Sequence, residues 1–152
     1  MNILPLLAIA AGVAISLQAT LNARLGVLID SALLSTGFAF SVGAIICWVI
    51  AIASGQLASS ADQLTHAPLY LYVSGGFLGA LGVGMLYFLI PKIGIGPMTV
   101  FSLGGQLFVA TIASHFGWFD LPQSSVTPIK LIGIATLIVG VVLTNSEVLY
   151  AH

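Results

Sequence analysis

The chain has 152 residues, of which 59% are hydrophobic and 5% are charged. Soluble domains carry about 25% charged residues, so the three Lys and Arg and four Asp and Glu residues here are too few to cover a surface in water. The net charge of −1, with its basic residues dispersed, excludes a nucleic-acid interface, which needs clustered Lys and Arg. One cysteine and three distant histidines give neither an internal disulfide nor a local metal motif. We expect an integral membrane protein without a metal or other cofactor.

Five apolar stretches approach the length of about 20 residues that a helix needs to cross the hydrocarbon core. They are residues 3–22, 32–53, 69–90, 97–116 and 129–144. All charged residues lie outside these stretches or within a turn of their ends, as expected when a centred charge costs about 2.5 to 3.5 kcal/mol. The runs lack the period-two alternation of barrel strands. The sequence therefore predicts an all-α membrane protein, a single domain over residues 1–152 with five transmembrane helices.

Residues that favour helix ends stand at the predicted boundaries. Asp30 or Ser31 can accept a hydrogen bond from the first turn of the second helix. Thr127 followed by Pro128 predicts an N-cap and a proline at the first helical position of the fifth helix. Pro68 is expected to open the third helix in the same way.

The segments around the spans differ in character. Residues 54–67 are rich in Ser, Gln and Asp and predict a solvated loop, whereas residues 91–97 contain Pro and Gly and predict a short link that makes the third and fourth spans an antiparallel hairpin. The first stretch lacks the basic start and convincing cleavage site of a secretory signal, so we expect it to remain as a helix of the mature protein.

The basic residues are almost evenly divided between the two membrane faces. With five crossings, Arg24 and Lys92 share one face, and Lys130 lies on the other with the N-terminus. Orientation follows an excess of Lys and Arg in short loops, and two against one is a weak excess. We therefore expect the chain to insert in both orientations and to form an antiparallel homodimer, with an inverted symmetry like that of larger transporters. The alternative is a single orientation set by Arg24 and Lys92.

Amide side chains within the spans are candidates for a binding site. Gln18 and Asn22 are four residues apart and so share one helix face. Gln106 lies near the middle of the fourth span, with Ser102 one turn before it. Polar groups inside a membrane commonly line cavities or pathways, so these four residues are candidate substrate contacts. The alternative is that they only bond neighbouring helices together.

The third span is rich in glycine and ends near a tyrosine. Gly75, Gly76, Gly79 and Ala80 let another backbone approach closely, so we expect them to form a helix-packing seam. Tyr87 is a further candidate substrate contact, and an interfacial position is its alternative.

The sequence lacks the residue patterns of buried carboxylate sites, catalytic centres and phosphate-binding loops. No Asp or Glu lies deep in a span; the acids, which lie near the span ends, are Asp30, Asp62, Asp120 and Glu147. There is no nucleophile with a base and orienting group, and no phosphate-binding glycine loop. The protein is therefore not expected to be an enzyme.

Six segments carry a resemblance to a known family: residues 18–26 (QATLNARLG), 40–43 (FSVG), 75–80 (GGFLGA), 91–94 (PKIG), 105–107 (GQL) and 115–117 (HFG). Together they resemble the YdcZ-like proteins of the drug/metabolite transporter superfamily, whose larger EamA-type members look like two inverted five-helix halves. The resemblance implies five helices, a bacterial cytoplasmic (inner) membrane location and a half-size unit that pairs.

The resemblance also bears on individual residues. Gln18, Asn22 and Gln106 match polar positions of the family. Ser114 stands before His115 where an aspartate is expected, so a gating or coupling role for such an acid does not carry over.

Three hypotheses for the function follow. The first is a transporter of a small molecule, with alternating access in an antiparallel homodimer around a midplane cavity lined by amides and aromatics. The second is a dual-topology ion channel. The third is a structural or accessory membrane subunit without transport activity. The absence of a buried charge favours a solute that is neutral, zwitterionic or recognised by aromatic side chains over a strongly charged one.

Overall fold

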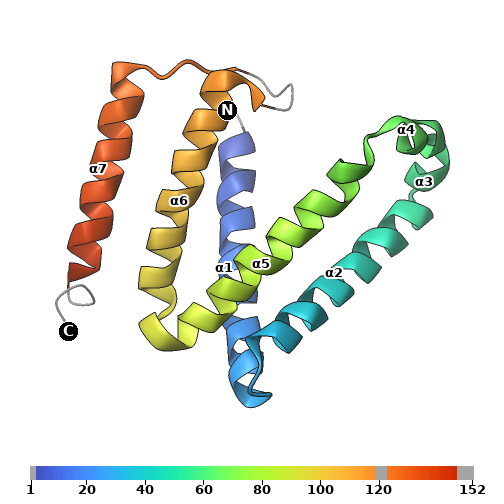
Figure 1. Cartoon of the computed structure of the whole chain (residues 1–152), viewed down its shortest axis with the longest axis horizontal. Helices are drawn as coiled ribbons and strands as arrows, with labels where there is room; N and C mark the ends of the chain where they lie inside the picture. Colours follow the sequence, from blue (N-terminus) through green and yellow to red (C-terminus); the bar gives the residue numbers. More distant parts are fainter. Residues whose placement is uncertain (1–2, 119–122, 147–152) are drawn as a thin grey trace. The chain divides into compact units, whose positions relative to one another are not determined.

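The computed structural model describes residues 3–118 and 123–146, and all regular structure in these residues is helical. The helices in chain order are α1 (Leu4–Leu28), α2 (Ala32–Ala53), α3 (Gln56–Ser59), α4 (Ala61–His66), α5 (Leu69–Ile93), α6 (Ile95–Phe116) and α7 (Pro128–Thr144) (Figure 1). Asp120 and Glu147, two of the acids near predicted span ends, lie outside the described residues.

Each of the five predicted spans corresponds to a helix. The helices α1, α2, α5 and α6 are long and apolar enough to cross a membrane. The fifth predicted span is the shorter apolar helix α7, whose 17 residues extend about 26 Å at 1.5 Å per residue. That length is slightly below the roughly 30 Å of a hydrocarbon core. All-helical architecture is confirmed, with four long apolar helices and one shorter helix.

The connections were predicted less well than the spans. The expected loop at residues 54–67 is largely helical, because α3 and α4 form there after Gly55 takes a left-handed conformation with φ of 74°. The Tyr72 hydroxyl donates to the Leu64 carbonyl over 2.7 Å, which ties α4 to the start of α5. The expected link at residues 91–97 is also shorter than predicted. Helix α5 continues through Pro91, and the break comes at Gly94, whose φ is 86°.

The predicted caps are confirmed at two helix starts. The Ser31 hydroxyl accepts a hydrogen bond from the Leu34 amide at 3.2 Å and caps α2, whereas Asp30 takes a left-handed conformation in the preceding turn. The Thr127 hydroxyl accepts from the Lys130 amide at 3.3 Å, next to a proline at the start of α7. Both hydroxyls satisfy amides that a helix start leaves unpaired.

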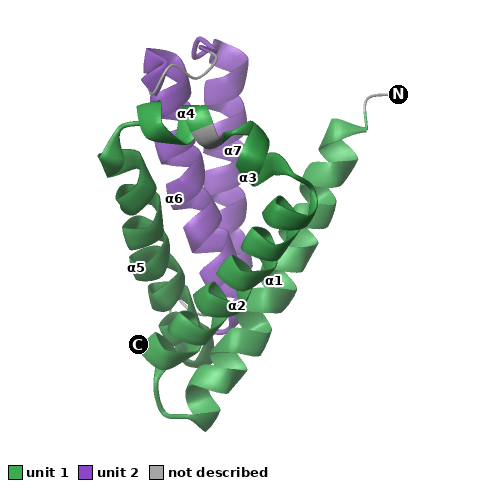
Figure 2. Ribbon diagram, turned by 90° about the vertical axis from the view of Figure 1, so that its right-hand side faces the viewer, with its two compact units in different colours: residues 1–92 green, residues 93–152 purple. Residues whose placement is uncertain are grey.

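The chain divides into two compact units, residues 1–92 and residues 93–152 (Figure 2). In the first unit, α1 and α2 meet at the turn around Asp30 and diverge away from it (Figures 1 and 2). The turn is tight because Gly26 lacks a side chain. A Cβ there would lie 3.3 Å from the Ala32 Cα.

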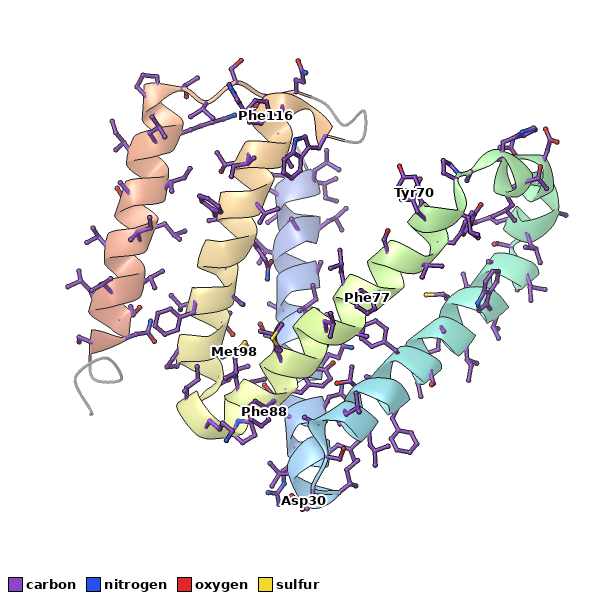
Figure 3. The ribbon with its side chains drawn as sticks, in the orientation of Figure 1. Asp30, Tyr70, Phe77, Phe88, Met98 and Phe116 are labelled. Carbon is purple, nitrogen blue, oxygen red and sulfur yellow. The ribbon has the colours of Figure 1, made fainter. Side chains whose placement is uncertain are left out.

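Burial in the first unit is confined to the end where its three long helices meet. The buried residues are Ala19, Ala23, Gly26, Ser35, Thr36, Tyr87 and Ile90. In the most hydrophobic window of each of its three long helices only 6% of the residues are buried. Most apolar side chains therefore project from the helices, as Figure 3 shows for Phe77 of α5, and are available to lipid or to another chain.

In the second unit α6 packs against α7, and Gln123 and Ser124 lie against the end of α6. Gly117 ends α6 in a left-handed conformation with φ of 61°. A Cβ at this position would lie 2.6 Å from the Gln123 Cγ. The Ser124 amide donates to the Ser114 carbonyl over 2.9 Å. Gly117 is therefore favoured by its left-handed backbone conformation, whereas the exposed Gln123 side chain could move away from an added Cβ.

Candidate functional site

Asn22 joins the three long helices of the first unit. Its side-chain Nδ2 donates to the Tyr87 hydroxyl over 3.1 Å, which links α1 to α5. Its backbone carbonyl accepts a hydrogen bond from the Ser35 hydroxyl, which links α1 to α2. Tyr87 is only 2% exposed, so its side chain is buried among the helices of the first unit. Its interfacial position and its contact with a substrate both stay predictions.

Gln18 lies one helical turn from Asn22 and faces a crevice between α1 and α2. The crevice has a volume of about 390 Å³, and its lining residues are Gln18, Asn22, Leu25, Phe38, Ala39, Val42, Gly43 and Ile46. Gln18 also lines a neighbouring hollow of about 330 Å³ against α2. The side chain is exposed, and its amide makes no hydrogen bond within residues 3–118 and 123–146.

A second hollow lies at the end of the first unit where the helices meet. Its volume is about 350 Å³, and its lining includes Asp30 from the α1–α2 turn together with Tyr87, Phe88 and Lys92 from α5. Figure 3 labels Asp30 and Phe88. The Lys92 Nζ lies 4.4 Å from the centre of the Phe88 ring, a cation–π contact. In the described part of the chain, Asp30 and Lys92 form no ion pair within 4.0 Å.

The hydrogen bond between Asn22 and Tyr87 connects the linings of these two hollows. Asn22 lines the crevice beside Gln18, and Tyr87 lines the end hollow beside Lys92. The two hollows share no lining residue. The bonded pair therefore lies between them.

The two candidate residues of α6 belong to the second unit. The Ser102 hydroxyl donates to the Thr99 carbonyl of its own helix over 3.1 Å. Gln106 is exposed, and its amide has no hydrogen-bond partner among the residues that the structure describes. Sequence reasoning placed both residues on one face of α6, and their contact with a substrate stays a prediction.

The glycines of α5 differ in their surroundings. A Cβ at Gly79 would lie 3.3 Å from the Phe40 ring of α2, and one at Gly84 would lie 3.3 Å from the Thr36 hydroxyl. By contrast, Gly75 and Gly76 have nothing within 4 Å of an added Cβ. Ala80 is exposed as well. Their role in packing against another helix therefore stays a prediction.

Two structural features beside the candidate residues were missed from the sequence. One is the pair Ser35 and Thr36, buried to 0% and 2% exposure beside Asn22. A hydroxyl pair in the first turn after the Ser31 cap was the available signal. The other is a hollow of about 480 Å³ between α6 and α7, with Lys130 at one end. Ser114, the departure from the family pattern, also lines it and hydrogen-bonds through its hydroxyl to the Ser124 carbonyl at 3.4 Å.

The residues described provide no site for a metal ion, since no three of their His, Cys, Asp and Glu side chains come together. The arrangement offers amides, hydroxyls and a phenol beside open hollows, which suits the binding of a solute. A family model described as "Putative inner membrane exporter, YdcZ" matches residues 3–143. The chain belongs to this family.

Membership of the YdcZ family confirms the resemblance seen in the sequence. It makes the chain a multi-pass inner-membrane protein of a transport family, not an enzyme. No solved structure matches the chain.

Proposed function

We propose that the chain is one half of an exporter of small neutral or zwitterionic solutes, completed by a second, oppositely oriented copy. The observation that carries this proposal is the unpartnered amide of Gln18 in a crevice beside the Asn22–Tyr87 hydrogen bond. Burying an amide in an apolar medium without a partner costs roughly 2 to 7 kcal/mol. The crevice therefore needs water, a solute or a partner chain to satisfy Gln18.

The Asn22–Tyr87 hydrogen bond serves as a closure in this proposal. It ties α1 to α5 between the crevice and the end hollow. Breaking it separates two helices whose contact is otherwise limited to a small buried cluster. A single interhelical hydrogen bond is worth about 0.6 to 2 kcal/mol in a membrane, which a bound solute can offset. Such a bond holds a closed state without making it permanent.

The chemistry of the two hollows supports a solute without net charge. The crevice presents amides and apolar side chains, and no charged residue lines it. The end hollow contains one acid and one base, Asp30 and Lys92. A zwitterion can pair with both groups. A solute with a net charge is repelled by the group of like charge, and it loses its hydration without gaining a counter-charge when it enters the uncharged crevice.

Pairing of two inverted copies is supported by the apolar surface that a single copy leaves exposed. The long helices keep most of their apolar side chains exposed, and Gly75 and Gly76 face open space. Small residues of this kind are typical of interfaces between membrane helices. In the pair, each copy supplies Gln18, Asn22 and Tyr87 from its first unit, and Ser102 and Gln106 remain candidate substrate contacts on α6 of its second unit.

The test is solute release from proteoliposomes loaded with a bacterial metabolite extract and followed by mass spectrometry. Wild-type protein is expected to release at least one uncharged or zwitterionic solute faster than protein-free vesicles. Gln18→Ala and Gln106→Ala should slow that release about tenfold. Gln56→Ala removes a matched amide from α3, outside the spans, and should have no effect.

Two outcomes would support the other hypotheses. Stepwise ion currents across planar bilayers, without solute release, would favour a channel. If neither a solute nor an ion crosses in the presence of wild-type protein, the transport proposal is wrong and an accessory role is favoured.

A further inference from the structure

The hollow between α6 and α7, which we call the α6–α7 groove, changes in character along its length. Its volume is about 480 Å³. Its polar lining residues are Thr111, Ser114, Ser124 and Lys130, and its apolar ones are Leu107, Ala110, Val126, Gly133, Ile134 and Leu137. The cation and two serines lie where α6 ends and α7 begins, whereas the apolar residues continue along both helices. The groove is therefore polar at one end and apolar along the rest of its length.

Among the residues that the structure describes, no carboxylate compensates the positive charge of Lys130 at the polar end of the groove. Its Nζ donates to the Ser124 hydroxyl and, over 3.0 Å, to the Ser125 carbonyl. An ammonium has three hydrogens to donate, so one remains, and both acceptors are neutral. No carboxylate of the described residues lies within 4.0 Å of it. An anion is the missing partner.

The position of the groove in a membrane follows from α7. This helix begins at Pro128, so Lys130 lies in its first turn and at the membrane interface once α7 enters the bilayer. The groove follows α7 from Lys130 to Leu137, a depth of about 10 Å at 1.5 Å per residue. A small water-soluble anion could use only the mouth. An occupant of the whole groove needs an anionic head and an apolar tail.

Gly133 keeps the apolar part of the groove open. A Cβ added at this position would meet nothing within 4 Å. The space is therefore not required for close packing of α7 on α6, and a chain of methylene groups can occupy it. Basic pockets between membrane helices bind anionic lipid headgroups by the same combination of charge and depth.

We propose that the α6–α7 groove binds an anionic phospholipid. The phosphate lies at Lys130, within reach of the Ser114 and Ser124 hydroxyls, and the upper part of one acyl chain lies along Gly133 and Leu137. The site is separate from the Gln18 crevice, and the proposal does not depend on what the protein exports.

The first test compares lipid binding by charge variants. Purified protein in detergent is titrated with equal amounts of dioleoylphosphatidylglycerol and dioleoylphosphatidylcholine, and bound lipid is counted by native mass spectrometry. Wild type is expected to prefer phosphatidylglycerol. One lysine near a membrane surface contributes about 1 kcal/mol toward anionic lipid, so Lys130→Gln should lower the preference about fivefold. Lys130→Arg should keep it, and so should Arg24→Gln, which removes an equal charge outside the groove.

The second test changes the apolar part alone. Gly133→Leu fills the groove where a Cβ has room, so it should lower retention of both lipids while unfolding at an unchanged temperature. Because Asp120 lies near this segment in sequence, Lys130→Gln is also measured in an Asp120→Asn background, where the same loss of preference is expected.

Three results would overturn the proposal. One is a phosphatidylglycerol preference that survives both Lys130→Gln and Gly133→Leu. A second is full competition by millimolar inorganic phosphate together with no effect of Gly133→Leu, since the mouth would then bind a free anion. The third is a change in oligomeric state, but not in bound lipid, on Gly133→Leu, because a second copy of the chain would then occupy the groove.

Discussion

Asn22 both links helices through hydrogen bonds and lines the candidate crevice. Its backbone carbonyl and its side chain bond to α2 and α5 respectively, so one residue of α1 holds the only described junction of these three helices through side-chain hydrogen bonds. The same side chain lines the crevice that contains Gln18. Its spacing from Gln18 indicated the shared face, but its partner, Tyr87, is 65 residues away and could not be identified from spacing.

The Asn22–Tyr87 pair makes a prediction about stability. Tyr87→Phe removes the hydroxyl and leaves the Asn22 amide without this partner, which should lower the free energy of unfolding by about 1 kcal/mol. Tyr70→Phe is the matched control, because the exposed Tyr70 hydroxyl has no hydrogen-bond partner among the described residues. Thermal unfolding in detergent measures both. A double-mutant cycle with Asn22→Leu should give a coupling of about 0.6 kcal/mol or more, and zero coupling would contradict the assigned bond.

At the scale of elements, helix ends rather than helix interiors determine the detail of the fold. The interiors are uniformly apolar, and any of their residues favours a membrane helix. The ends depend on single residues with particular backbone conformations. Ser31 and Thr127 begin helices as their side-chain chemistry predicts. Gly55, Gly94 and Gly117 separate helices by taking positive φ.

Gly117 provides the test at this scale. Gly117→Ala places a Cβ in a left-handed conformation and close to the Gln123 side chain, so it should lower the free energy of unfolding by about 1 to 2 kcal/mol. Gly12→Ala, in the interior of α1 with nothing within 4 Å of an added Cβ, should leave stability unchanged or raise it by roughly 0.5 to 1 kcal/mol. Size-exclusion profiles after heating distinguish the two. Equal stability of both variants would refute the role assigned to Gly117.

For the whole molecule, the central feature is how little of its apolar surface one chain buries. In each of the four long helices only 6% of the most hydrophobic window is buried. Lipid can cover such surfaces, but it cannot satisfy the Gln18 and Gln106 amides. A second copy can do so, and an inverted copy also yields the two-fold arrangement that larger transporters build from internal repeats.

Dual topology can be tested with two single cysteines placed beyond opposite ends of α5, and so on opposite faces of the membrane. In a Cys47→Ala background, Ser59→Cys in α3 and Gly96→Cys at the start of α6 are both exposed. If the chain inserts both ways, a membrane-impermeant maleimide added outside spheroplasts should label about half of each variant. If it inserts one way, only one of the two variants should be labelled. The second result would remove the inverted pair from the proposed mechanism.

The sequence by itself determined the class of protein, the positions of the apolar helices, the caps of α2 and α7 and the family. Each of these depends on composition, on runs of neighbouring residues or on local motifs, which the chain displays directly. Only the tertiary structure decided that Tyr87 bonds Asn22, that Ser35 and Thr36 are buried, and that Lys130 stands at the mouth of a groove. The five apolar helices of the described residues carry only isolated polar side chains such as Gln18, Asn22 and Gln106, which do not show which side of a helix meets which neighbour. These contacts therefore arise only when helices distant in sequence come together.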